Sequence, residues 1–180
     1  MITTTRLVAL LFVVVVFLLP TQNLYAELPV GKVPPTITLD GDDGGKIAGG
    51  KWSSTEITGK VFCLMYVDPD EKDINAHVEQ AMKAENFPEE KFASIAMINL
   101  GASWKPNFVI DSILEGKQKD FPKTIYVRDV NEKIAEIWNL TTDSYCIVLF
   151  NKNGEVLMSK DGKFSDDDTQ KLLKLIKDNL

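Results

Sequence analysis

A run of seven apolar residues, VFCLMYV from Val61 to Val67, constrains the fold of this 180-residue chain more than any other feature. It follows a chain-breaking glycine and ends in the acidic stretch DPDEKD. A strand with one face in water alternates apolar and polar residues, whereas this run is apolar throughout. It therefore predicts a central strand with both faces covered, which requires a layer on each side of a sheet.

The segments after this strand alternate between helical and extended patterns. Apolar spacing predicts helices over 73–86 and 107–119 and a short helix or hairpin arm over 133–140, while buried strands are expected over 92–100 and 123–129. A hairpin, YCIVLF-NKNG-EVLMSKDG, and a final capped helix close the chain. This order predicts an α/β three-layer sandwich, a central mixed sheet with helices on both faces.

Two segments between these elements are expected to be loops. The glycine-rich stretch 40–50, DGDDGGKIAGG, predicts a mobile loop. The loop GASWKPN holds Trp104, which either seals the sheet edge or is a contact residue, and the edge seal is the favoured interpretation. Trp52 and Trp138 are expected in the core.

The first 26 residues have the pattern of a secretory signal peptide. Arg6 precedes thirteen apolar residues over 7–19, and a polar stretch then leads to Ala26 at the expected cleavage site. The apolar run is short for a membrane span, although an uncleaved anchor is the alternative because Leu24 stands where a small residue is usual. We expect a signal peptide over 1–26, one domain over 27–180, and no stable membrane association after cleavage.

Charge and histidine content argue against two classes of function. Arg6 is the one charged residue among the first 26, so the mature chain has 19 basic and 26 acidic side chains and a net charge of −7. Such a surface offers little to a phosphate backbone, and nucleic-acid binding is not expected. His77 is the sole histidine, which excludes zinc sites built on several histidines. No metal or other cofactor is predicted.

Three fragments resemble the thioredoxin fold in its secreted, reductase-like and peroxiredoxin-like form: VGKVPPTITLDG, ITGKVFCLMYV and SYCIVLFNKNGEVLMSKDG. Five pieces are similar, more narrowly, to a YtfJ-type family of exported bacterial proteins: VPPTITL, GKV, FVIDSILE, IAEIWNL and the closing NKNGEVLMSKDG with FSDDD after it. The resemblance spans essentially the whole mature chain. It implies a thioredoxin-like fold over 27–180 and a periplasmic location.

The resemblance also implies where redox groups would stand. Active members carry Cys-x-x-Cys at the start of the helix after the buried strand, and here Glu71 and Ile74 take those positions. The peroxidase pattern, a threonine and a nucleophilic cysteine, falls on Asp73 and Ala76. A carboxylate cannot take part in disulfide exchange. The expected function is therefore that of a non-redox binding or accessory protein, with another envelope protein as its partner.

A binding groove is expected at the same corner of the fold. The family's cis-proline position falls on Tyr145 or Cys146, and the start of this strand faces the helix N-terminus across a shallow groove. The candidate groove residues are Glu71, Lys72, Tyr145 and Cys146. Tyrosine is an amphipathic contact residue. The alternative is an ordinary surface, with Tyr145 packed on its own loop.

The carboxylates after the central strand have two interpretations. Asp70, Glu71 and Asp73 would sit in the first turn of the next helix, where free N–H groups and the helix dipole favour negative charge. Alternatively, Asp68, Asp70 and Asp73 could bind a hard cation, although their spacing is not that of a calcium loop. The stretch DGDDGG at 40–45 also lacks the distal glutamate of such a loop. The helix-start interpretation is favoured.

Cys63 and Cys146 are the only cysteines, and export by itself favours a disulfide between them. If their strands are antiparallel neighbours, the two residues lie three to four positions apart along the sheet, roughly 10 Å or more, which is beyond disulfide reach. We therefore expect two unpaired thiols. The alternative function is a single-thiol oxidoreductase or peroxidase using Cys146, although an acid-rich corner does not favour a thiolate.

Overall fold

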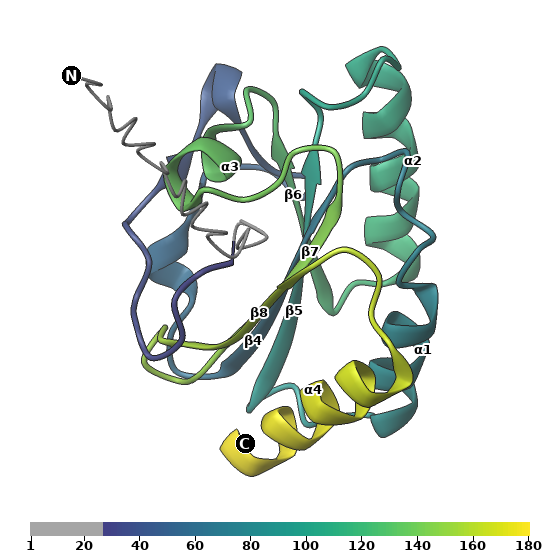
Figure 1. The fold of residues 1–180 in the computed structure, drawn as a ribbon. Coiled ribbons are helices and arrows are strands. Elements are labelled where there is room, and N and C mark those ends of the chain that lie inside the picture. Colours follow the sequence, from purple (N-terminus) through teal and green to yellow (C-terminus); the bar gives the residue numbers. More distant parts are fainter. Residues whose placement is uncertain (1–26) are drawn as a thin grey trace, which may run out of the picture.

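The central strand predicted from the sequence, β4 (Val61–Val67), is buried at all seven positions. The structure, a computed structural model, describes residues 27–180, and the predicted signal peptide lies outside these residues. Strands β5 and β7 flank β4, the first parallel and the second antiparallel to it. Helices and loops cover both faces of the resulting sheet, which explains why β4 has no polar side (Figure 1).

The sheet is mixed, as predicted. Its order is β2-β6-β5-β4-β7-β8, in which β4, β5 and β6 are parallel and the other three strands are antiparallel to their neighbours. The remaining strands of this sheet are β2 (Gly44–Lys46), β5 (Phe92–Asn99), β6 (Thr124–Asp129), β7 (Tyr145–Phe150) and β8 (Val156–Asp161).

The two faces of the sheet are covered by different kinds of structure (Figure 1). One face packs against three helices, α1 (Ala76–Glu85), α2 (Asn107–Asp120) and α4 (Asp166–Asn179). The other packs against the six-residue α3 (Lys133–Trp138) and a two-stranded ribbon of β1 (Thr38–Leu39) and β3 (Trp52–Ser53). Two 3₁₀ turns, η1 (Gly41–Asp43) and η2 (Ser54–Glu56), accompany the ribbon.

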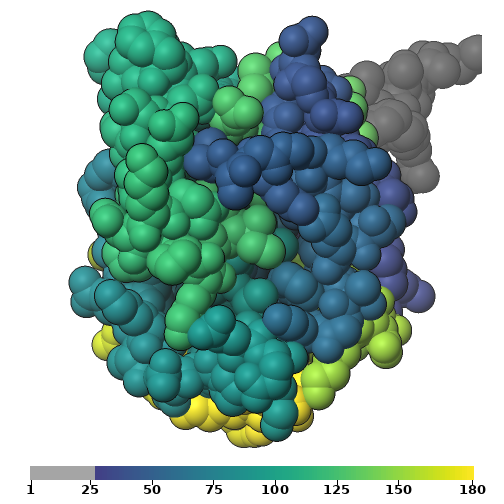
Figure 2. All heavy atoms as spheres, turned by 180° about the vertical axis from the view of Figure 1, so that it is seen from behind, coloured from purple at the N-terminus to yellow at the C-terminus, as the bar shows by residue number. Residues whose placement is uncertain are grey.

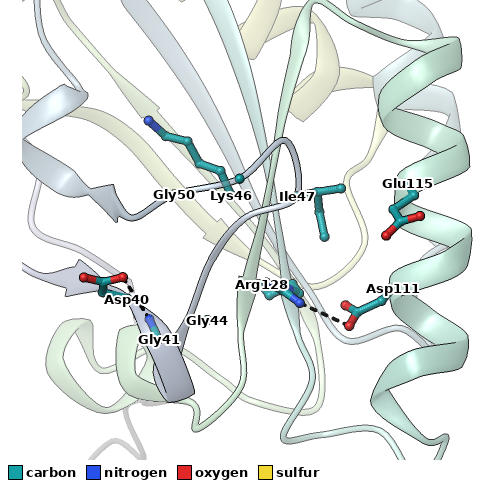
Figure 3. Close-up of a pocket in the computed structure, with 10 residues that line it drawn as sticks. Asp40, Gly41, Gly44, Lys46, Ile47, Gly50, Asp111, Glu115 and Arg128 are labelled. Atoms are coloured by element: carbon teal, nitrogen blue, oxygen red, sulfur yellow. Dashed lines mark hydrogen bonds and ion pairs between the residues drawn. The ribbon is translucent and has the colours of Figure 1, made fainter.

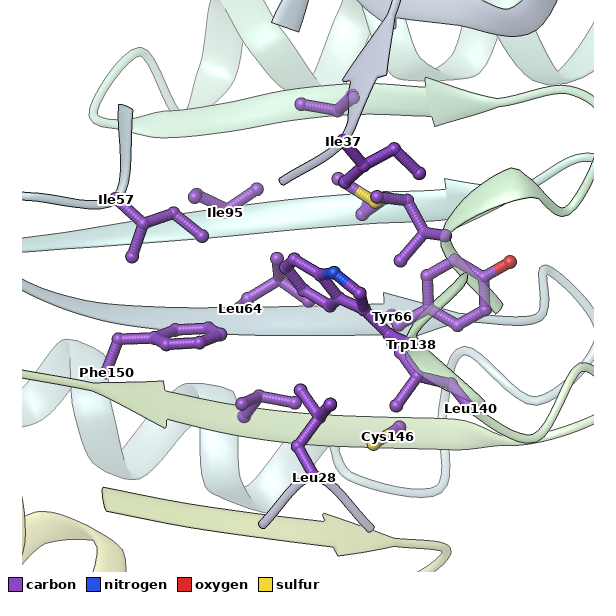
Figure 4. Packing of buried hydrophobic residues seen from close by; sticks show 14 of the residues in the cluster. Leu28, Ile37, Ile57, Leu64, Tyr66, Ile95, Trp138, Leu140, Cys146 and Phe150 are labelled. Carbon is purple, nitrogen blue, oxygen red and sulfur yellow. The ribbon is translucent and has the colours of Figure 1, made fainter. Parts of the chain in front are cut away.

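The core on the α3 face is built around aromatic side chains (Figure 4). The rings of Trp138 and Phe150 lie 6.0 Å apart, and the indole N–H of Trp138 donates to the carbonyl oxygen of Pro35 at 2.8 Å. Trp52 is buried in the same cluster, as expected, and Ile57 is buried there as well. The long N-terminal segment thus serves as part of the layer that covers the sheet.

The segment 40–50, expected to be a mobile loop, is instead part of the sheet. It contains η1 and the edge strand β2, which pairs with β6. Gly44 has a φ of +119°, and a Cβ on it would lie 2.1 Å from the carbonyl oxygen of Arg128. Glycine is therefore required for β2 to approach β6, and the glycine-rich sequence conceals a strand.

The other predicted elements are confirmed with small shifts at their ends. The helix expected from residue 73 begins at Ala76, and the segment 133–140 contains a helix rather than a hairpin arm. Within residues 27–180, no helix has both the length and the apolar character needed to cross a membrane.

Candidate functional site

Buried polar side chains gather where the parallel strands end. Asp68 directly follows β4, Asn99 is the last residue of β5, and Asp129 is the last residue of β6. All three are buried. Because ligands of open α/β sheets bind outside the carboxyl ends of the strands, this end of the molecule is the candidate functional site.

The acidic turn, residues 68–75, leads from β4 to α1. A carboxylate oxygen of Asp68 accepts from the backbone N–H of Asp70 at 2.8 Å, and the carbonyl oxygen of Asp68 accepts from the N–H of Glu71 at 3.0 Å. The helix itself starts only at Ala76. The prediction that Asp70, Glu71 and Asp73 occupy its first turn is therefore wrong, because the Asp68 side chain stabilises a separate turn first.

The carboxylates of the acidic turn are largely engaged. Asp70 pairs with Lys105 from the loop before α2, and Asp73 pairs with Lys72. Burial raises the pKa of the Asp68 carboxyl above its ordinary value. Residues 27–180 contain no group of three or more side chains placed to hold a metal ion. The cation interpretation of this turn has no geometric support.

Glu71 and Ile74 occupy the turn between β4 and α1, at the positions where the thioredoxin resemblance places a dithiol. Glu71 is half-buried and Lys72 is exposed. Neither described thiol lies in this turn, since Cys63 and Cys146 are both within strands. Of the four groove candidates, only Glu71 and Lys72 reach the surface.

Tyr145 starts β7 opposite Val67, at the expected corner, but its side chain points into the core. It is 1% exposed, and its hydroxyl donates to a carboxylate oxygen of Glu79 in α1 at 2.7 Å. Burial raises the pKa of the Tyr145 phenol, and the Glu79 carboxylate raises it further. The expectation that Tyr145 lines a groove is corrected, because this position of β7 faces the α1 layer.

Cys146 is fully buried in the core on the α3 face (Figure 4). Burial raises the pKa of its thiol to about 12, and the carboxylate of Asp161 across the ladder contributes in the same direction. A reactive cysteine needs access and a stabilised thiolate, and this environment offers neither. Cys146 therefore does not line the predicted groove either.

The two thiols lie on opposite faces of the sheet. Cys146 pairs with Tyr66 in the antiparallel register, whereas Cys63 pairs with Leu149, three positions away. Cys63 belongs to the core under α1, and burial raises its pKa to about 12. Since three residues span about 10 Å of strand, a disulfide between these cysteines would require the sheet to rearrange. The geometry supports the expectation of two unpaired thiols.

Asp129 anchors a buried network that the sequence analysis did not identify. Its carboxylate accepts from the Tyr66 hydroxyl at 3.1 Å and from the backbone N–H groups of Lys133 and Ile134 at 2.9 and 2.8 Å. Burial raises its pKa, and these hydrogen bonds oppose that shift. The sequence feature that could have indicated this network is an aspartate at the end of a predicted strand, four residues before a short helix.

Asn99 connects three loops at the same end of the sheet. Its amide group donates to Glu132 at 3.1 Å and to the carbonyl oxygen of Thr142 at 3.2 Å, and its oxygen accepts from the N–H of Gly101 at 3.1 Å. These bonds fix the loops that surround the strand ends. The polar network thus makes the floor of the candidate site rigid. The side chains that could contact a partner lie above this floor, at the surface.

Trp104 lies beside the acidic turn and is strongly exposed. Lys105 joins the two, because its ammonium pairs with Asp70 and lies 5.2 Å from the centre of the Trp104 ring. The exposure favours the contact-residue interpretation over an edge seal. Phe108, one helical turn further on, is also exposed. Helical spacing predicted α2 but not which of its apolar residues face outward.

A cavity of about 280 Å³ lies at a different place, between β2, β6 and α2 (Figure 3). Gly44 and Gly50 line one wall and Glu115 another. Its one guanidinium, that of Arg128, already pairs with Asp111 at 3.1 Å. This pair joins β6 to α2 at the sheet edge, and the Asp111 Oδ1 and Arg128 Nε atoms are buried there without a hydrogen-bond partner.

The family model described as "Bacterial protein of unknown function (YtfJ_HI0045)" matches residues 37–179. The chain is 26% identical over 167 residues to the uncharacterized protein YtfJ of Escherichia coli K12, covering 88% of this chain and 91% of that protein. An uncharacterized protein of Haemophilus influenzae is 28% identical over 129 residues, covering 69% and 70% of the two chains.

The fold is also that of solved thioredoxin-like structures. A thiol-disulfide isomerase from Corynebacterium glutamicum superposes with a TM-score of 0.59 at 17% identity, covering 81% of this chain and 96% of that one. This similarity concerns the fold alone. The match over residues 37–179 shows the narrower relationship: the chain belongs to the YtfJ_HI0045 family of bacterial proteins, on a thioredoxin-like fold.

Proposed function

We propose that this protein is exported to the periplasm and acts there by binding another envelope protein, without thiol exchange. The observation that carries this proposal is the position of the two thiols. Both are buried within strands, on opposite faces of the sheet, and burial raises the pKa of each to about 12. The turn where a dithiol would stand contains a glutamate and an isoleucine.

The surface left for function at this corner is a contact surface. Glu71 and Lys72 reach solvent in the acidic turn, and Trp104 lies next to it through Lys105. The floor beneath is fixed by hydrogen bonds of the buried residues Asp68 and Asn99. A rigid scaffold that carries exposed charged and aromatic groups is suited to recognition of a protein surface.

The alternative is a single-thiol oxidoreductase or peroxidase that uses Cys146. The test is turnover of hydrogen peroxide and of a mixed-disulfide substrate by the mature protein, by Cys146→Ser, and by Cys63→Ser as the matched control. We expect all three proteins to show the same rate, close to background. Turnover that is lost in Cys146→Ser and kept in Cys63→Ser would overturn the proposal.

Export and partner binding are tested in cells. The periplasmic fraction is expected to contain the protein with Glu27 as its N-terminal residue. A photo-crosslinking amino acid at Glu71 is expected to give one reproducible adduct with an envelope protein. The same group at Lys152, exposed in the turn between β7 and β8, serves as the control and should not. Retention of residues 1–26, or identical adducts from both positions, would contradict the proposal.

A further inference from the structure

The end of the loop before α2 and the N-terminal half of α2 present apolar side chains to water. Trp104 is 82% exposed, Phe108 75%, Val109 37% and Ile113 54%, and we name these four residues the apolar α2 face. The opposite side of the helix is buried through Ile110 and Leu114, so the helix is already anchored to the sheet. Soluble monomers rarely expose a contiguous apolar patch of this kind without a binding role.

Charged residues border this surface but leave its apolar members exposed. Lys105 lies against the Trp104 ring, Asp111 pairs with Arg128, and Glu115 is exposed one turn after Asp111. The exposed position between Val109 and Ile113 is the uncharged Ser112. In the rear view, α2 stands out at the edge of the molecule, in teal-green beside the blue segment that contains β2 (Figure 2). The apolar α2 face is therefore accessible to a partner.

The acidic turn borders this face. The turn contains four carboxylates and one lysine, Lys72, and a second lysine, Lys105, lies next to it. Both lysines are already paired, with Asp73 and Asp70. Glu71, at the surface of the turn, forms no ion pair with any other residue of the described part of the chain. The rim of the apolar α2 face thus has an excess of negative charge.

We propose that the apolar α2 face docks a segment of a partner protein that carries apolar side chains next to at least one lysine or arginine. The apolar groups would cover Phe108 and Ile113, and the basic group would reach Glu71. This inference rests on the proposed binding function and supplies the chemistry of the partner. Charge decides between occupants, because a second copy of this acidic chain or an anionic lipid surface would be repelled where a basic segment is attracted.

Trp104 provides a direct readout of docking. Trp52 and Trp138 are buried, so quenching by acrylamide reports on Trp104 alone. Twelve-residue synthetic peptides of three compositions serve as probes: apolar with lysine, apolar with glutamate, and polar with lysine. We expect only the first to shift Trp104 emission to the blue and to protect it from acrylamide, with binding weakened several-fold as the salt concentration rises.

Variants locate the site. Phe108→Ser and Ile113→Ser are each expected to weaken binding at least tenfold, and Glu71→Gln several-fold with a smaller salt dependence. Ile137→Ser is the matched control, because Ile137 is an exposed apolar residue of α3 on the other side of the sheet, and binding should be unchanged. Phe108, Ile113 and Ile137 are exposed and Glu71 is half-buried at the surface, so circular dichroism should show the wild-type fold.

Several outcomes would overturn the inference. Equal binding of the lysine and glutamate peptides would contradict the basic partner, and no binding by any peptide would contradict the site. Protection of Trp104 by protein concentration alone, with dimers in sedimentation, would assign the face to a second copy. Protection by phosphatidylglycerol vesicles alone would assign it to a membrane. These outcomes concern Trp104, whereas the thiol assay tests the non-redox proposal separately.

Discussion

Within residues 27–180, two tyrosines hydrogen-bond to carboxylates, one carboxylate buried and the other at the surface of a helix. The Tyr66 hydroxyl donates to the buried Asp129, whereas that of Tyr145 donates to Glu79, which lies on the exposed side of α1. A carboxylate that can turn to water loses little when its donor is removed. A buried carboxylate keeps its desolvation penalty and loses a partner.

Tyr66→Phe is therefore expected to lower the free energy of unfolding by about 1.5–3 kcal/mol at pH 7, and Tyr145→Phe by about 0.5–1.5 kcal/mol. Urea denaturation of the three proteins measures both. An equal loss for the two variants would contradict the role assigned to burial at Asp129.

The effect of Tyr66→Phe depends on pH with a defined sign. Burial raises the folded-state pKa of Asp129 above its unfolded value, so the fold favours the neutral carboxyl, and the Tyr66 hydroxyl stabilises the ionised form. The loss in Tyr66→Phe should be largest at neutral pH, and it should shrink as the pH falls through the folded pKa. A loss that grows on acidification would show that the Tyr66 hydroxyl bonds to the neutral Asp129 carboxyl rather than to the ionised one.

For single residues, the sequence predicted which residue lies at a given place in the fold better than it predicted where that side chain points. Glu71 and Ile74 stand at the predicted corner because their positions follow from the length of β4 and the turn after it. Tyr145 was assigned to the wrong surroundings, since both faces of a central strand are buried and no alternation indicates where a side chain points. The edge seal favoured for Trp104 is wrong, because the side chain is strongly exposed and a loop has no periodicity that indicates which side chains face outward.

Among the elements, β2 shows how glycine can hide a strand. Its two glycines face β6 at a distance that leaves no room for a Cβ at Gly44. Sequence rules interpret DGDDGG as a loop because glycine is rare within strands. The long, regular elements were predicted almost residue by residue, α2 from its helical apolar spacing and β5 from its run of mostly apolar residues.

Gly44→Ala is expected to lower the free energy of unfolding by about 2–4 kcal/mol, since the new methyl group would clash with the carbonyl oxygen of Arg128 and the φ of +119° is unfavourable. Gly116→Ala in α2 is the matched control. No atom lies within 4 Å of its Cβ position, and it should be neutral or stabilise by up to about 1 kcal/mol. Thermal unfolding compares them, and tolerance of Gly44→Ala would argue against β2.

For the whole molecule, the decisive relationship is the one between the sheet and its two covering layers. The sequence indicated three layers because the central strand had no polar face, and the structure shows helices on one face and a mixed layer on the other. The sequence could not show that Cys63 and Cys146 belong to different layers, because that follows from the register between β4 and β7. This separation keeps the two sulfur atoms apart.

The number of free thiols in the protein tests the central claim most directly. Protein purified without reductant would be denatured and titrated with a thiol reagent, and its mass measured to establish that it is monomeric. Two free thiols per chain are predicted, since Cys63 and Cys146 lie three positions apart on opposite faces of one sheet. No free thiol in a monomer would mean that the two sulfur atoms meet, and both the register and the non-redox function would then be wrong.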